Sequence, residues 1–128
     1  MAVYRLLGYA CGHGYLIHEL VHVVQAYRGG GAGWLTEGIA DYIRWGLYEE
    51  KPQEWFPVPR DADRAYRQGY QVAAGFLLWL ENSRSPGIVK KLNAASREKR
   101  YSDELFKEET GTTLDELWAK YKKAREKK

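Results

Sequence analysis

The sequence predicts a mainly α protein, a compact helical bundle of about five to six helices. Apolar residues recur at the 3.6-residue period of a helix along most of the chain. Capping residues, prolines and glycines mark where those helices begin and end, and no stretch alternates convincingly as a half-buried strand does. With 128 residues and 45% hydrophobic content, the chain can build one core but not two. We therefore expect a single domain over residues 1–128.

The first clear helix is expected from about Tyr15 to Tyr27, after a start that glycines interrupt. Its apolar residues are expected to cover the face opposite His18 and His22, which leaves the two imidazoles at the edge of a core. These apolar residues are Leu16, Ile17, Leu20, Val21, Val24 and Tyr27.

A second helix is expected from about Trp34 to Tyr48, after a glycine-rich link that lets the chain turn back. Its apolar stripe consists of Leu35, Ile39, Ile43 and Leu47. Gly38 lowers helix propensity by about 1 kcal/mol, which indicates that another backbone or a substrate approaches closely there. Trp34 and Trp45 either line a hydrophobic substrate pocket or belong to the core.

The remaining helices follow a proline-rich loop in which Trp55 and Phe56 are expected to fold back on the protein. A third helix is expected from about Ala62 to Asn82, a fourth begins with Ser85-Pro86, and a short fifth runs from Ser102 to Gly111. Thr113 and Glu116 form a capping box for the last helix. Its inner stripe is Leu114, Leu117, Trp118 and Tyr121.

The stretch His18-Glu19-Leu20-Val21-His22 carries the chemistry that the sequence predicts. Residues four apart share one face of a helix, so the two imidazoles can converge on one zinc ion. Glu19, about a quarter-turn away, can reach a water on the metal rather than the metal itself, as a general base requires. A pair of ordinary helix histidines is the alternative.

A matching carboxylate pair follows in Glu37-Gly38-Ile39-Ala40-Asp41. Catalytic zinc takes three protein ligands and leaves one position open for water. Glu37 can supply the third ligand, and Asp41, one turn later, can hold the second ring nitrogen of one His. The alternative is that both carboxylates form a solvated face or pair with Arg44. Cys11 and His13 could bind metal in principle, but we interpret them as incidental.

Composition excludes several functional classes. The net charge is +3, and the basic residues crowd the last nine positions, where they suit a helix end. Only Tyr121 is interleaved with them as a stacking aromatic, so no nucleic-acid partner is expected. The single Cys excludes an internal disulfide. We expect no membrane span and find no signal peptide in this chain.

Four segments carry a family resemblance: HELVHVVQ, LTEGIADYIR, RQGYQVAAGFLLWLE and YSDELFKEETGTTLDELWAKYK, in this order from about Tyr15 to Lys122. In these the chain resembles the basic secretory protein family of plant and bacterial metallopeptidases. The resemblance implies a zincin-type endopeptidase of the gluzincin class, with His18, His22 and Glu37 on zinc and Glu19 as general base. It also implies a secreted setting and a peptide or protein substrate.

The donor that stabilises the oxyanion of the reaction must be sought among the tyrosines, because no His follows the motif. Tyr70 is the first candidate, since it matches the family's GYxV segment and shares a helix face with Gly69. Tyr66 and Tyr42 are weaker candidates, and Tyr70 could equally be a core residue.

The chain departs from the family in one respect. Members carry a longer region before the HExxH helix, expected to include a β-sheet whose edge strand aligns the substrate. Only 17 residues precede His18, too few for a sheet of ordinary strands. We therefore expect the upstream β-sheet to be absent, as in a truncated or miniaturised member.

The function predicted is zinc-dependent peptide-bond hydrolysis, in which a metal-activated water attacks and Glu19 takes its proton. One alternative is a zinc-binding helical domain with little or no peptidase activity, because the aligning strand is missing. Another is a metal-free helical interaction module. Two His and one carboxylate also suit Fe(II). Substrate preference and oligomeric state do not follow from the sequence.

Overall fold

The computed structural model describes residues 16–21, 32–59, 64–68 and 70–126. Within these ranges the chain is helical and contains no strand, which confirms the mainly α prediction. Residues 16–21 form a helical segment that carries the start of the HExxH motif. The elements that follow are α3 (Gly33–Asp41), η1 (Tyr42–Tyr48), η2 (Gln53–Trp55), η3 (Ala65–Gln68), α4 (Tyr70–Trp79), η4 (Leu80–Arg84), α5 (Ile88–Arg97), α6 (Glu104–Thr110) and α7 (Leu114–Glu126).

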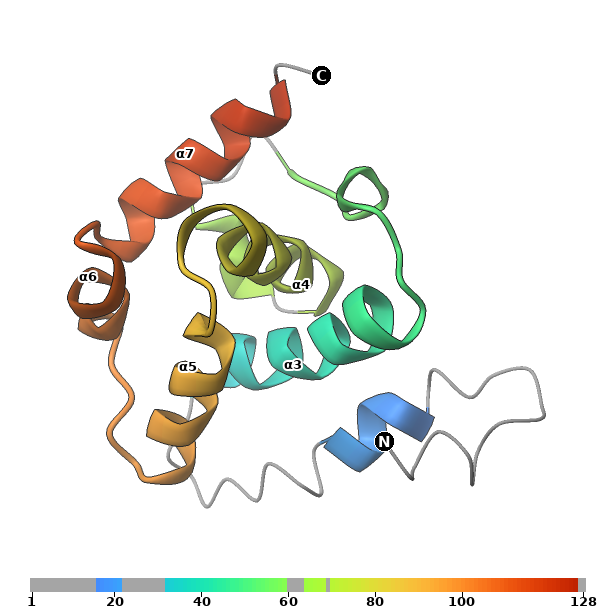
Figure 1. The fold of residues 1–128 in the computed structure, drawn as a ribbon, viewed down its shortest axis with the longest axis horizontal. Helices are drawn as coiled ribbons and strands as arrows, with labels where there is room; N and C mark the ends of the chain where they lie inside the picture. Colours follow the sequence, from blue (N-terminus) through green and yellow to red (C-terminus); the bar gives the residue numbers. More distant parts are fainter. Residues whose placement is uncertain (1–15, 22–31, 60–63, 69, 127–128) are drawn as a thin grey trace.

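Helix α4 lies at the centre of the bundle, and α3, α5, α6 and α7 surround it (Figure 1). Every residue from Val72 to Leu80 is buried, as expected for a helix that is apolar on all sides. Phe76 is the hub of an aromatic core, with ring centroids 5.4–6.3 Å from its neighbours. These neighbours are Tyr66, Phe106, Trp118 and Tyr121. The core therefore joins η3 and α4 to the C-terminal helices α6 and α7.

Helix α3 packs directly on α4, and Gly38 makes the close approach possible. A Cβ atom at Gly38 would lie 2.6 Å from the Cβ of Ala73, a distance that real Cβ atoms do not tolerate. The sequence predicted that a backbone or a substrate comes close at this glycine, and the neighbour is another helix. Glu37, which immediately precedes Gly38, is thereby held at the edge of the α3–α4 contact.

The helix expected over Trp34–Tyr48 changes type at Tyr42, where α3 passes into the π-helical turn η1. Its hydrogen bonds extend to i−5, as in the 2.9 Å bond from the Glu49 amide to the Arg44 carbonyl. A π turn advances each residue by a smaller angle than an α turn does. The predicted stripe is therefore correct for Leu35 and Ile39, which are fully buried, and wrong for Leu47, which is 50% exposed.

The single helix expected over Ala62–Asn82 is broken. The 3₁₀ turn η3 and helix α4 are separate elements, and η4 continues α4 as a π turn. Arg64 and Tyr70, which precede η3 and begin α4, have φ angles of 58° and 52° in the left-handed region. A non-glycine residue with such a φ angle changes the direction of the chain, which apolar periodicity alone does not reveal.

Two of the expected helix starts are also wrong. Helix α5 begins at Ile88 after Gly87, and the Glu81 carboxylate accepts hydrogen bonds from the amides of Gly87 and Val89. Ser85 accepts from the Ile88 amide through its carbonyl oxygen. Helix α6 begins at Glu104 instead of Ser102. The predicted end at Gly111 and the predicted cap of α7 are confirmed, since the Glu116 amide donates to Thr113 Oγ1 at 3.3 Å. The four residues of the predicted α7 stripe are all buried.

Within the described ranges, no helix combines the length and the apolar character that a membrane crossing requires.

Substituting Gly38 by Ala tests the α3–α4 contact. We expect the free energy of unfolding to fall by about 1–3 kcal/mol, because the added methyl group overlaps Ala73. The gain in helix propensity, up to about 1 kcal/mol, offsets only part of this loss. Urea denaturation measures the change. Gly33→Ala is the matched control, because no atom lies within 4 Å of the Cβ position there. Equal stability of the two variants would contradict the close contact.

Candidate active site

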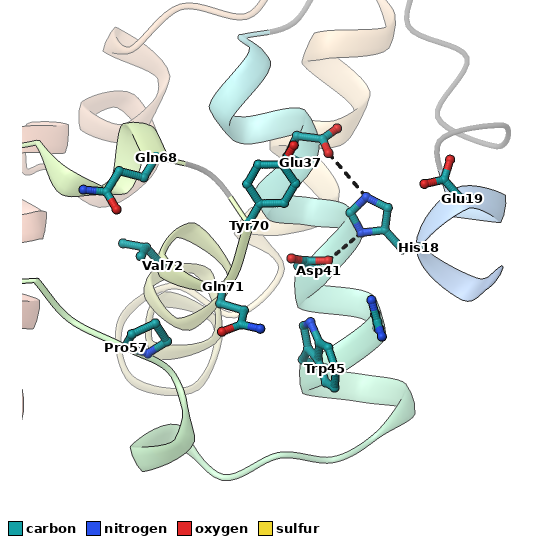
Figure 2. Close-up of a pocket in the computed structure, with 11 residues that line it drawn as sticks. His18, Glu19, Glu37, Asp41, Trp45, Pro57, Gln68, Tyr70, Gln71 and Val72 are labelled. Carbon is teal, nitrogen blue, oxygen red and sulfur yellow. Dashed lines mark hydrogen bonds and ion pairs between the residues drawn. The ribbon is translucent and has the colours of Figure 1, made fainter. Parts of the chain in front are cut away.

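The side chain of His18 extends from the helical segment 16–21 to α3. The residue is 7% exposed, and its Nδ1 atom lies 2.5 Å from Oδ1 of Asp41, which is itself buried (Figure 2). Ile17 is buried beside it, whereas Leu16 is 43% exposed. The expectation that these apolar residues face the core is therefore correct for Ile17 and wrong for Leu16. The expected position of His18 at the edge of the core is correct.

The other ring nitrogen of His18 faces Glu37. Nε2 lies 3.3 Å from Oε1 of Glu37, and Figure 2 shows the imidazole lying between the two carboxylates of α3. Asp41 follows Glu37 by one helical turn, so both carboxylates lie on one face of the helix. A neutral imidazole whose Nδ1 proton is donated to Asp41 directs a lone pair from Nε2 at the Glu37 carboxylate. This arrangement is favourable only with a proton or a cation between the two atoms.

The separation of these two atoms fits two ligands of one zinc ion. Zinc binds imidazole nitrogen at about 2.0–2.1 Å and carboxylate oxygen at about 2.0–2.2 Å in tetrahedral geometry, which places two ligand atoms roughly 3.3–3.5 Å apart. The observed 3.3 Å between Nε2 and Oε1 lies in that range. Among the described residues, no group of three or more His, Cys, Asp and Glu side chains is arranged to hold a metal. His22, the predicted third ligand, lies outside the described residues, as do Cys11 and His13.

The surroundings of Asp41 shift the pKa of its carboxyl group in opposite directions. Burial raises the pKa of its carboxyl group above the ordinary value. The hydrogen bond with His18 and the charges of His18 and Arg44 lower this pKa in part, and Glu37 raises it slightly. The buried carboxylate therefore depends on the partners that compensate for its burial, and His18 is the one that it contacts directly.

Tyr70, the first residue of α4, lies near the imidazole of His18. Its ring is parallel to that of His18, with an interplanar angle of 8° and centroids 6.5 Å apart. The side chain is 56% exposed, so Tyr70 is not a core residue. Its left-handed φ of 52° is a strained conformation for a residue with a Cβ atom, and such strain is often found at functional sites.

These side chains line one cavity of about 600 Å³. Of the predicted site residues, it brings together His18, Glu19, Glu37 and Tyr70, with Asp41 beside them. Glu19 is exposed, on the segment that carries His18 (Figure 2). The other side of the cavity is formed by the proline-rich loop, η1, the end of η3 and the first turn of α4. These elements contribute Arg44, Trp45, Pro57, Gln68, Gln71 and Val72.

The two weaker tyrosine candidates lie elsewhere. Tyr66 is 1% exposed, and its hydroxyl donates a 2.7 Å hydrogen bond to Asp115. Burial and this bond raise the pKa of Tyr66 to about 12. Tyr42 is 8% exposed, and burial likewise raises its pKa to about 12. Neither residue lines the cavity of His18, so Tyr70 is the tyrosine of the three that faces it.

The sequence left the roles of several residues open. Trp45 lines the cavity, whereas Trp34 is partly buried and packs against the core, with its ring centroid 4.8 Å from that of Tyr66. Arg44 was considered only as an ion partner of Glu37 and Asp41, and its place in the cavity wall was missed. The positions of Gln68 and Gln71 were missed as well. The π turn at η1 and the break before α4 place these residues, and neither feature has a signature in the apolar pattern.

Comparison with known proteins gives one family. A family model, BSP, described as peptidase of plants and bacteria, matches residues 12–121. Neither the curated proteins nor the solved structures include a match.

The His18–Asp41 bond predicts one tautomer of His18. In the metal-free protein, at a pH where the ring is neutral, we expect the proton on Nδ1. Both ring nitrogens face a carboxylate, but the Nδ1–Asp41 separation is 2.5 Å and the Nε2–Glu37 separation is 3.3 Å, so the stronger hydrogen bond is the one from Nδ1. Long-range ¹H–¹⁵N NMR spectra identify the protonated nitrogen. Asp41→Ala should move the proton to Nε2, which faces Glu37, and Asp41→Asn, which retains a side-chain acceptor, should keep part of the preference for Nδ1. An unchanged tautomer in Asp41→Ala would contradict the assignment.

Proposed function

The chain belongs to the BSP family, the peptidases of plants and bacteria, and from this premise we propose that it is a zinc metallopeptidase that hydrolyses peptide bonds with Glu19 as the general base. One observation carries the proposal: His18 directs Nε2 at Glu37 across 3.3 Å while Asp41 holds Nδ1. This is the pairing of ligand and supporting carboxylate that zinc sites use.

The proposed zinc ligands are His18, His22 and Glu37. The fit rests on the donor set, two imidazoles and one carboxylate, and on the spacing of the first and third ligands. Zinc, when bound there, would supply Lewis-acid polarisation of the scissile carbonyl and lower the pKa of a water molecule. Asp41 would keep the lone pair of His18 Nε2 available by fixing the proton on Nδ1.

Glu19 is the proposed general base. Its side chain is exposed and lines the cavity, so both water and a peptide can reach it. It would accept the proton of the attacking water and pass it to the leaving amine.

Tyr70 is the proposed donor to the oxyanion that forms at the scissile carbonyl. Its ring lies parallel to the His18 imidazole, and the side chain is exposed to the cavity. A hydroxyl group placed in advance can donate to the developing negative charge without reorganisation, which is the main source of this kind of stabilisation.

The substrate proposed is a peptide or protein. We also propose that the protein acts outside the cell, a proposal supported by the resemblance to basic secretory proteins.

Glu19→Gln tests the general base. The amide cannot take a proton, so we expect kcat for a peptide substrate to fall by about 10²–10⁴-fold. Zinc content by elemental analysis should stay at the level of the unmodified protein, because Glu19 is not a proposed ligand. Glu108→Gln, a change of the same kind at an exposed position on α6, is the control and should leave kcat unchanged. Full activity of Glu19→Gln would contradict the role. A chain that binds no zinc and cleaves no peptide would overturn the whole proposal.

Tyr70→Phe tests the oxyanion donor. Removal of one such donor costs about 10²–10³-fold in kcat, and KM should change little, because the bond forms only in the transition state. Tyr66→Phe is the control: it loses the bond to Asp115 and about 0.5–1.5 kcal/mol of stability, but it should keep kcat. If Tyr70→Phe retained normal kcat, the donor would have to be another group.

A further inference from the structure

Arg44 gives the cavity a positive charge that the proposed reaction does not use. Among the described residues that line the cavity it is the one Arg or Lys, and the other titratable groups there are the His18 imidazole, the Tyr70 hydroxyl and the carboxyl groups of Glu19, Glu37 and Asp41. The Arg44 side chain is 22% exposed, so most of it is covered while part remains accessible.

The guanidinium group of Arg44 is held in place by an aromatic pair. Its Cζ atom lies 4.0 Å from the centroid of the Trp45 ring, within the range of a cation–π contact. Trp45 in turn packs against Trp55, with centroids 4.8 Å apart. An Arg stacked in this way keeps a fixed plane, so it loses little conformational freedom when its N–H groups bind a ligand.

The hydrogen-bonding capacity of Arg44 is not consumed by the part of the fold that the structure describes. Its Nε atom is buried and has no hydrogen-bond partner among the described residues, so the two Nη nitrogens at the partly exposed end of the side chain are the donors that a ligand can reach. The carboxylate of Glu49 lies 3.9 Å away, beyond hydrogen-bond distance. A guanidinium group carries five N–H donors in a planar fork that matches a carboxylate group.

We propose that Arg44 binds a carboxylate group of the substrate, so that the enzyme prefers peptides that carry one near the scissile bond. This inference rests on the proposed peptidase function and specifies its substrate class. The other carboxylates of the cavity repel an anion, so a substrate carboxylate is accepted beside Arg44 and disfavoured elsewhere.

The separation of Arg44 and Glu37 along α3 and η1 limits where in the peptide this carboxylate can be. Arg44 is seven residues beyond Glu37 (44 − 37 = 7), a rise of no more than roughly 10 Å. An extended peptide covers about 3.3 Å per residue. The carboxylate therefore lies up to about three residues from the scissile bond. It is either the side chain of an Asp or Glu or the C-terminal carboxylate of a short peptide.

Matched fluorogenic peptides test the preference. One pair has Glu or Gln at successive positions up to three residues from the cleaved bond, and a second pair ends in a carboxylate or a carboxamide. We expect kcat/KM to be about 10- to 100-fold higher for the charged member of at least one pair, mainly through KM. The pair that responds identifies the source of the carboxylate. Equal cleavage within both pairs would overturn the inference and leave the peptidase proposal intact.

Variants of Arg44 separate its charge from its shape. Arg44→Gln should cleave the charged and uncharged members of each pair with equal kcat/KM, and the ratio within a pair is the quantity compared. Arg44→Lys should keep a weaker preference, because an ammonium group lacks the planar fork. Lys51→Gln is the control: Lys51 lies 5.3 Å from the Trp55 ring but does not line the cavity, so the preference should persist. A preference that survives in Arg44→Gln would contradict the assignment.

Binding without cleavage keeps this inference separate from the proposed reaction. Zinc-loaded Glu19→Gln protein is titrated with the same peptides, and Trp fluorescence reports binding beside Trp45. We expect the charged peptides to bind about 10- to 100-fold more tightly. The added Arg44→Gln change should remove this difference. Selective binding supports the inference even if the protein cleaves nothing, and equal binding contradicts it.

Discussion

The geometry of the site depends on how closely α3 packs on α4. The contact at Gly38 and Ala73 leaves no room for a side chain between the two helices. With this pair of helices fixed, Glu37 and Asp41 project from the edge of α3, and Tyr70 at the start of α4 faces the same cavity. A larger residue at position 38 would push α3 and α4 apart and so move Glu37 and Asp41 relative to Tyr70. Such a change would act on the chemistry without touching a reacting atom.

The hydrogen bond between His18 and Asp41 attaches the HExxH segment to this frame. It joins residues 23 positions apart in the sequence and is buried at both ends. Burial of Asp41 raises its pKa and makes an isolated carboxylate unfavourable, so the imidazole beside it is part of what makes the arrangement stable. The same bond directs the other nitrogen of His18 toward Glu37. One contact thus serves both the fold and the proposed chemistry.

The sequence predicted those features that depend on local spacing. Glu37 and Asp41 share a face because they are four residues apart on a helix, and the α7 stripe is buried because it follows the 3.6-residue period. The pairing of Asp41 with a His of the motif was expected from the usual support of a metal ligand, and the structure shows that pair for His18. The start of α7 and the end of α6 were predictable because Thr113 and Gly111 have strong local preferences.

Features that arise from tertiary packing could not be predicted in this way. The π turn at Tyr42 changes the angular register, which exposes Leu47 and places Arg44 and Trp45 in the wall of the cavity. The left-handed backbone at Tyr70 ends the periodicity that had suggested a core residue. The side-chain cap of α5 comes from Glu81, a carboxylate in the preceding element, rather than from the adjacent Ser. Each of these departures reflects a contact between elements.

The most direct test of the account is the location of zinc in crystals of the zinc-loaded protein, measured by anomalous scattering at the zinc edge. The account predicts one ion between His18 Nε2 and Glu37, with the imidazole of His22 as the third ligand and a remaining position open to solvent. An ion bound elsewhere, or no ion between His18 Nε2 and Glu37 at saturating zinc, would contradict it.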